Sequence, residues 1–157
     1  MTIKLLLIGK TTDKNLQKLT DQYAKRLKHY INFKMEALPE LKNRKNLSEK
    51  LQKAQESELI LKKLHPSDEV VLLDEKGKAH SSVEFSKWLQ KQMLSGKKQL
   101  VFVVGGPYGF SPELYRRADQ KLALSKMTFS HEMVRPFFIE QLYRGFSILR
   151  NEPYHHR

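Results

Sequence analysis

The residues best placed to do chemistry are the glycines that follow an apolar run at residues 100–104. A Gly-Gly-Pro sequence starting at Gly105 ends that run, and a helix-start signal, Ser-Pro-Glu, begins at Ser111. This order predicts a buried strand with a glycine turn at its carboxyl end, where open α/β sheets bind ligands. A residue without a Cβ lets backbone approach a ligand closely. The same pattern is also compatible with a strand-to-helix turn that binds nothing.

The end of the chain is the second place where chemistry is concentrated. Tyr154, His155, His156 and Arg157 bring together an aromatic ring, two imidazoles and a guanidinium. These groups can stack on a base, carry a proton and bind phosphate. Chain ends are usually frayed, but we expect this one to lie beside the ligand crevice. No metal is expected at the two histidines, because no further ligand stands at a suitable spacing.

The elements that must position these residues alternate between strand and helix. Apolar runs and alternating patterns predict strands at residues 3–8, 33–38, 69–74, 99–104 and 121–124. Apolar residues spaced by three and four predict helices at residues 15–30 and 131–150. Three more helices are expected to begin at a capping side chain: one runs from Asn46 or Ser48 to residue 64, one from Ser81 or Ser82 to residue 93, and a short one starts at Ser111. The fold class is therefore α/β, a mostly parallel sheet flanked by helices on both faces.

Two local features qualify this assignment. Residues 75–78, Glu-Lys-Gly-Lys, are expected to form a turn, and Pro136 should delay or kink the start of the last helix. That helix is apolar around more of its circumference than one core face needs, since Met133 and Phe137 lie outside its main stripe. We therefore expect it to serve a partner subunit as well, in a homodimer.

Composition limits the class of protein. The 157 residues fit one domain, and they include 29 Lys and Arg against 17 Asp and Glu, a net charge of +12. Such a field attracts polyanions, so a nucleic-acid partner is expected, although a merely solvated basic surface would look the same. No stretch is long and apolar enough to span a membrane, and the chain has no cysteine. The cytoplasm is the expected location.

The motifs, taken in order, resemble those of a known family. Neither a dinucleotide fingerprint nor a P-loop is present. Instead the chain has strand-Gly-Gly-Pro-x-Gly from Gly105, Leu-Ser-x-x-Thr from Leu124, His-x-x-Val-Arg from His131 with Glu-Gln-Leu-Tyr-Arg after it, and Asn-x-Pro-Tyr-His near its end. Over its whole length it is similar to the ribosomal RNA large subunit methyltransferase H family, within the SPOUT superfamily of α/β-knot methyltransferases. An added histidine near the end departs from the family pattern.

The resemblance implies an activity and a topology. It implies transfer of a methyl group from S-adenosylmethionine to N3 of pseudouridine 1915, in the loop of helix 69 of 23S ribosomal RNA. The expected substrate is the assembled ribosome, because no RNA-binding domain is appended. The resemblance also implies a single domain over residues 1–157 with a deep trefoil knot roughly within residues 70–157, which runs against the general rule of unknotted chains.

Site residues follow from the resemblance position by position. Methyl-donor contacts are implied at Leu73, Gly105, Leu124, Ser125, Lys126, Met127, Thr128 and Phe129. Apart from the family, the apolar ones among them would be read as core residues and the hydroxyls as turn formers. Catalysis is implied at Tyr154, His155 and Arg144: His155 or a water accepts the proton of N3, and Tyr154 stacks near the base. Arg135 and Arg157 are expected to bind RNA phosphates, or Arg135 to lie at a dimer interface.

Two other classes of function stay open on the residues alone. One is an RNA-binding or ribosome-assembly protein without catalysis, and the other is an enzyme that places a different nucleotide in the glycine crevice. Binding of S-adenosylmethionine separates all three.

Overall fold

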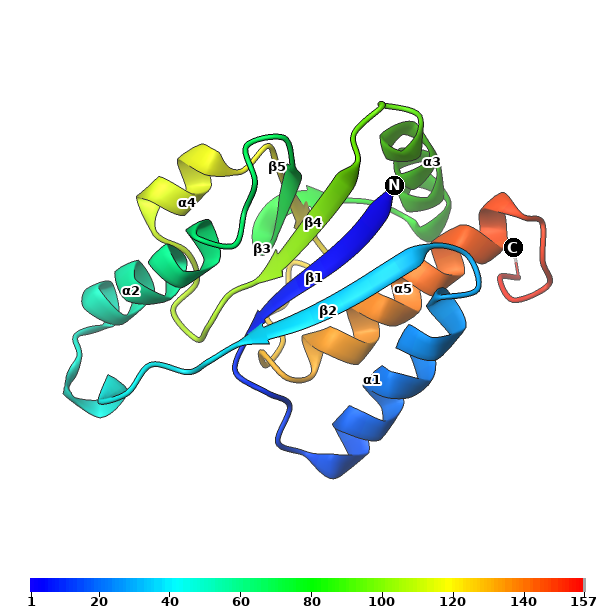
Figure 1. Ribbon diagram of the computed structural model, residues 1–157. Coiled ribbons are helices and arrows are strands. Elements are labelled where there is room, and N and C mark those ends of the chain that lie inside the picture. Colours follow the sequence, from blue (N-terminus) through cyan, green and yellow to red (C-terminus); the bar gives the residue numbers. More distant parts are fainter. Residues whose placement is uncertain (157) are drawn as a thin grey trace.

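The computed structural model describes residues 1–156, and its strands and helices alternate along the chain (Figure 1). The strands are β1 (Thr2–Ile8), β2 (Asn32–Leu38), β3 (Glu69–Ala79), β4 (Gln99–Val104) and β5 (Gln120–Ala123). The helices are α1 (Lys14–Leu27), α2 (Glu49–Leu61), α3 (Ser82–Met93), α4 (Pro112–Arg117) and α5 (Val134–Leu149), with a short 3-10 turn, η1 (Arg44–Asn46), before α2.

The five strands form one parallel sheet in the order β2-β1-β4-β3-β5. Because every pair is parallel, all five carboxyl ends meet at one edge of the sheet, and the loops that leave these ends lie together there. The α/β fold class predicted from the alternation of elements is confirmed.

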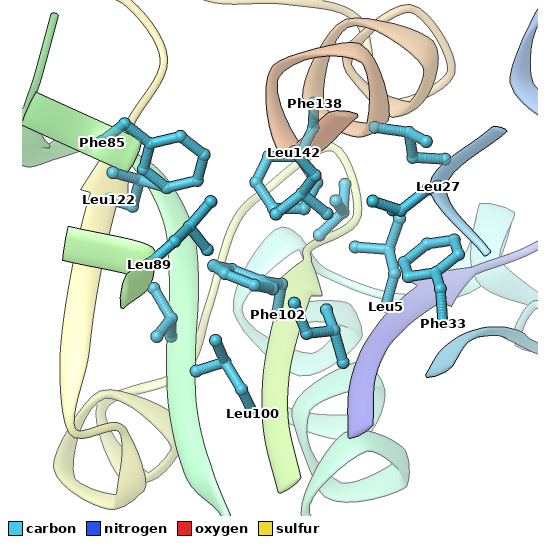
Figure 2. Packing of buried hydrophobic residues seen from close by; sticks show 14 of the residues in the cluster. Leu5, Leu27, Phe33, Phe85, Leu89, Leu100, Phe102, Leu122, Phe138 and Leu142 are labelled. Carbon is cyan, nitrogen blue, oxygen red and sulfur yellow. The ribbon is translucent and has the colours of Figure 1, made fainter. Parts of the chain in front are cut away.

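Helices cover both faces of the sheet. On one face α1, α3 and α5 pack over a core that includes Phe102, Phe138 and Leu142, which Figure 2 shows in contact across the sheet–helix boundary. On the other face α2 and α4 cover a smaller core through Ile60 and Leu114. A parallel sheet buried on both sides explains why β4 reads as a continuous apolar run rather than an alternating one.

Hydroxyl and carboxylate caps fix where the helices begin. Of the two caps proposed for α2, Ser48 is the one that accepts a backbone N–H, from Leu51. Ser81 caps α3 in a capping box with Glu84, and Ser111 caps α4. In α5 the regular helix starts late, so that Pro136 falls within the first turn, where a missing N–H costs nothing.

The turn expected at residues 75–78 is wrong, because β3 continues to Ala79. After a register shift beyond Leu73, the strand pairs again with β5 through Lys78 and Ala79. Gly77 serves this pairing, since a Cβ there would stand 2.6 Å from backbone atoms of β5. A glycine that reads as a turn signal is here required by the close approach of two strands.

None of the helices in residues 1–156 is long and apolar enough to cross a membrane. The trefoil knot expected in roughly residues 70–157 stays a prediction.

Candidate active site

A crevice of about 400 Å³ opens at the carboxyl edge of the sheet, beside the register shift of β3 and the ends of β4 and β5. The loop after β4, the segment after β5 and the start of α5 form its walls. It has the size of an ordinary small-molecule site and a mixed polar and apolar lining.

Seven of the eight residues assigned to the methyl donor line this crevice. They come from three separate stretches of the chain: Leu73, Gly105, Leu124, Ser125, Met127, Thr128 and Phe129. Lys126 does not line it, and its side chain is exposed. Met127 is 78% exposed at the rim, so it is not the core residue that its apolar character alone would suggest.

The two adjacent glycines are needed for packing within the protein as well as for any ligand. A Cβ on Gly105 would lie 3.0 Å from the Phe110 ring, and one on Gly106 would overlap the carboxylate of Glu56. Neither glycine has the left-handed backbone that the turn could have required; only Gly109 of this loop does, at φ +78°. Close approach of protein atoms is thus a second reason for glycine at both positions.

The crevice also contains polar groups that the sequence did not single out as ligands. The Tyr115 hydroxyl, from α4, donates to the carboxylate of Asp74, which follows Leu73 at the register shift of β3, and His131 also lines the crevice. Burial and this hydrogen bond raise the pKa of Tyr115, so that its phenol stays protonated and holds the carboxylate in place. Asp74 could have been suspected from its place at a strand end, but nothing local connects it with Tyr115, 41 residues away.

The expected RNA contact of Arg135 is wrong. Its side chain is 1% exposed and donates to the carbonyls of His131 and Ile8 and to the Thr11 hydroxyl, at 2.9–3.0 Å. These bonds fasten the start of α5 to the end of β1. A guanidinium that is buried, with each of its three nitrogens donating a hydrogen bond inside the protein, is not available to RNA phosphates, and it positions α5.

The catalytic candidates at the end of the chain form a cluster on α5, the tail cluster, built around Glu140. Arg144 and the Tyr154 hydroxyl both donate to Glu140 Oε1, at 2.6 and 2.8 Å. Arg144 also lies over the Tyr154 ring, 4.7 Å from its centroid, and its Nη1 lies 3.3 Å from Nδ1 of His155. On the α1 side, the Tyr23 hydroxyl is 3.2 Å from that of Tyr154.

These contacts restrict what each group in the tail cluster can do. Burial, with the hydrogen bonds to Tyr23 and Glu140, raises the pKa of Tyr154, so the phenol is a donor and a stacking surface but not a base. Because arginine only donates, Nδ1 of His155 is the acceptor of the Arg144 bond. A neutral His155 in this arrangement carries its proton on Nε2.

The tail cluster does not lie beside the crevice of its own chain, contrary to expectation. Val134, the first residue of α5, lines the crevice, whereas Tyr30, just before β2, stacks on Phe146 near the other end of α5. The helix therefore runs from the carboxyl edge of the sheet back toward the amino edge (Figure 1). Arg144 is ten residues beyond Val134, or about 15 Å along the axis.

The remaining assignments concern the last two residues and metals. His156 is exposed, and Arg157 lies outside the described residues. Within residues 1–156 no group of three or more His, Cys, Asp or Glu side chains could hold a metal ion.

Comparison with known proteins gives this site its family. A family model described as "Predicted SPOUT methyltransferase" matches residues 1–155. A protein of Flavobacterium johnsoniae named ribosomal RNA large subunit methyltransferase H is 64% identical over 157 residues, 100% of both chains. One of the same name from Bacteroides fragilis is 49% identical over 156 residues, 99% of both chains.

A solved structure agrees at the level of fold. A probable methylase family protein from Haemophilus influenzae superimposes with a TM-score of 0.50 at 14% identity, covering 95% of this chain and 66% of that one. The family model and the relatives cover essentially the whole chain, including the crevice and the tail cluster. The chain therefore belongs to the SPOUT methyltransferase family, and it is a methyltransferase.

Proposed function

We propose that this enzyme transfers a methyl group from S-adenosylmethionine to N3 of pseudouridine 1915 of 23S ribosomal RNA, in the loop of helix 69 of the assembled ribosome. The observation that carries the proposal is the match, over the full length and at 64% identity, to a ribosomal RNA large subunit methyltransferase. The crevice supports it, because its lining unites residues of β3 with the motifs that follow β4 and β5.

The residues of the crevice fit the methyl donor. Leu73, Leu124 and Phe129 offer apolar surface for the face of an adenine, and Gly105, Gly106 and Gly109 of the loop after β4 also line the crevice. The Asp74 carboxylate supplies negative charge that suits a cationic ligand. When bound, S-adenosylmethionine supplies an electrophilic methyl on a sulfonium.

The tail cluster supplies the groups that act on the acceptor base. N3 must lose its proton as it attacks, in line with the methyl and its leaving group. Tyr154 provides an aromatic ring on which the base can stack, and Arg144 a cation for the developing anion or a phosphate. His155, or a water that it orients, accepts the proton after the ring turns from Arg144 or exchanges its tautomer.

The distance between crevice and tail cluster supports a homodimer in which each site is shared. In one chain the two lie at opposite ends of α5, which favours an arrangement in which the tail cluster of a second subunit completes the crevice. Exposed apolar side chains from this part of the chain fit such an interface: Phe137 is 48% exposed, and Met127 and Met133 are exposed too. Apolar surface of this kind around a site marks an interaction surface.

Charge supports ribosomal RNA as the partner. The net charge of +12 attracts phosphate, and residues 1–64 carry 15 basic against 7 acidic side chains. The proposed location of the enzyme is the cytoplasm, where its ribosome substrate lies.

Two measurements test the proposal. Calorimetry of the pure protein should show binding of S-adenosylmethionine, which an RNA-binding protein without catalysis or an enzyme specific for another nucleotide would lack. Mass spectrometry of helix 69, after incubation with the methyl donor and ribosomes from a strain lacking the enzyme, should show one new methyl group on pseudouridine 1915. Methylation at another nucleotide would overturn the assigned target and leave the enzyme class intact.

A further inference from the structure

Glu56 is a buried carboxylate that the proposed mechanism does not use. It lies in the middle of α2, 4% exposed, and its Oε1 has no hydrogen-bond partner in the part of the chain that the structure describes. Burial raises the pKa of Glu56, while a hydrogen bond with Gln52 and the charge of Arg44 lower it in part. Buried acceptors are nearly always satisfied, so an unsatisfied carboxylate oxygen requires an explanation.

The carboxylate of Glu56 lies directly behind the glycine loop of the crevice. Its Oε1 would be 2.7 Å from a Cβ on Gly106 and its Oε2 closer still, so it fills the space beside that residue. The next residue on α2, Ser57, accepts the backbone N–H of Ser111 at 2.9 Å, at the far end of the same loop. Gly106 also lines the crevice. One thickness of backbone therefore separates Glu56 from the ligand space.

The loop of residues 105–110 is rich in glycine, the residue with the greatest backbone freedom. It contains three glycines, of which Gly109 has a left-handed conformation, and a single bridge from Gly109 N to Gly106 O closes it. Backbone N–H groups donate their strongest hydrogen bonds to ionised acceptors. An unoccupied carboxylate oxygen directly behind such a loop is an acceptor ready for these groups.

We propose that Glu56 is a positioning residue for the methyl-donor site: its carboxylate accepts backbone N–H groups of residues 105–110 as this loop closes on the donor. The proposal deepens the proposed function and rests on it. Glu56 does not touch the donor, because the loop lies between them. It acts by stabilising the closed backbone of residues 105–110. The affinity of the crevice for the donor therefore depends on α2, which holds the Glu56 carboxylate in place.

The proposal gives the pH dependence a definite sign. In the free protein, burial holds the pKa of Glu56 above its ordinary value, and the N–H groups of a closed loop would lower it. Closure therefore favours the ionised form, so donor affinity should rise with pH through the free-protein pKa and level off above it. The charged groups facing Glu56 are Arg44 and Glu40, which pair with each other at 3.1 Å and largely offset one another.

The test compares E56Q with E58Q, the same substitution two residues along α2, where Glu58 is exposed and paired with Lys62. Calorimetry with S-adenosylmethionine from about pH 5 to 8 should show that wild type and E58Q both bind the donor more tightly as pH rises. E56Q should bind about tenfold more weakly at the upper end, because an amide accepts less well than a carboxylate. Its affinity should lack the pH-dependent part, and its thermal midpoint should not fall.

Each outcome decides a different question. If E56Q matches wild type and E58Q in affinity and pH profile, Glu56 does not position the loop, although the proposed function stands. If wild type and E58Q fail to bind the donor, the proposed function fails. Amide hydrogen exchange gives a second readout of the positioning role: on addition of S-adenosylmethionine, residues 105–110 should gain more protection from exchange in E58A than in E56A, and equal gains would exclude it.

Discussion

At the scale of single residues, the closest approach behind the crevice is the one between Gly106 and Glu56. Because the carboxylate occupies the place of a Cβ, we expect G106A to lower the free energy of unfolding by about 1–3 kcal/mol, the usual cost of overpacking. Shortening Glu56 should remove the overlap that the new methyl group creates. The double variant E56A/G106A should therefore lose less free energy of unfolding than the two single variants lose together. Urea denaturation of wild type, E56A, G106A and the double variant measures this coupling. If the two losses of free energy were strictly additive, the methyl group added at Gly106 would not overlap the Glu56 carboxylate.

The tail cluster gives a second prediction at this scale. H155A should reduce methyl transfer to ribosomes by about 10²-fold or more, as expected for loss of a proton-transfer group, whereas H156A, at an exposed neighbour, should cost little. Y154F keeps the ring but loses the hydroxyl that joins Glu140 to Tyr23, so it should be intermediate.

All three variants should bind the donor as wild type does, because the residues assigned to the donor line the crevice and none of them belongs to the tail cluster. Single-turnover methylation assays and calorimetry report the two effects separately. Equal losses in H155A and H156A would contradict the assignment of His155.

Arg135 shows where residue-level reading of the sequence stops. An arginine after a His-x-x-Val motif suggests a cation for RNA, yet it is one of the largest fully buried side chains of the protein. The spacing along the helix could have predicted this burial. Phe138 and Leu142 follow Arg135 at three and seven residues and lie on the same buried face of α5. The carbonyl oxygens that accept its hydrogen bonds belong to β1 and to the segment before α5, and no local sequence pattern predicts these contacts.

At the scale of elements, Glu132 ties the segment before α5 to the loop before α1. Its carboxylate accepts the Thr12 backbone N–H at 2.5 Å, the Thr12 hydroxyl at 2.9 Å and the Asp13 N–H at 3.2 Å, and these bonds lower its pKa. A carboxylate with a depressed folded-state pKa stabilises the fold above its unfolded pKa of about 4.3 and loses this contribution as pH falls through the folded value.

We therefore expect E132Q to melt a few degrees below wild type at neutral pH, with the difference shrinking in acid below about pH 4. E58Q, which removes only an exposed pair on α2, should show no comparable change. Thermal melts followed by circular dichroism across this range provide the comparison. A difference that is constant with pH would show that the carboxylate charge plays no part.

Most elements were predictable because each has a local cause. The spacing of apolar residues set the helices, and the serines at positions 48, 81 and 111 set where three of them begin. The extension of β3 through Gly77 was not predictable, because its partner is β5, more than forty residues later. The crevice could be foreseen from three strand ends, but the direction of α5, which carries the tail cluster away from it, depends on packing across the whole sheet.

At the scale of the whole molecule, the basic charge should act mainly at the edge that carries the crevice. The segment between β2 and α2 leaves that edge and exposes Lys42 and Lys45, and the first turn of α2 exposes Lys50. Reversing all three to Glu should weaken ribosome binding and lower the slope of log affinity against log salt, by about one for each phosphate that is no longer bound.

A matched triple reversal at the opposite, amino edge, of Lys91, Lys97 and Lys98, changes the net charge equally. It should affect binding much less, if RNA meets the carboxyl edge. Filter binding to ribosomes over a salt series distinguishes the two variants. Equal slopes would mean that the charge acts only as a general field.

The course of α5 has one more consequence, for mixtures of defective proteins. If every working site combines one subunit's crevice with the other's tail cluster, a chain lacking residues 154–157 and a chain with a blocked crevice are each inactive alone, yet they can complement each other. Their mixed dimer contains one site with both parts intact and one with neither. After denaturation and refolding together in equal amounts, random pairing should recover about a quarter of the wild-type activity per subunit. A site contained within one chain would recover none, so this titration of one inactive protein by another measures the sharing directly.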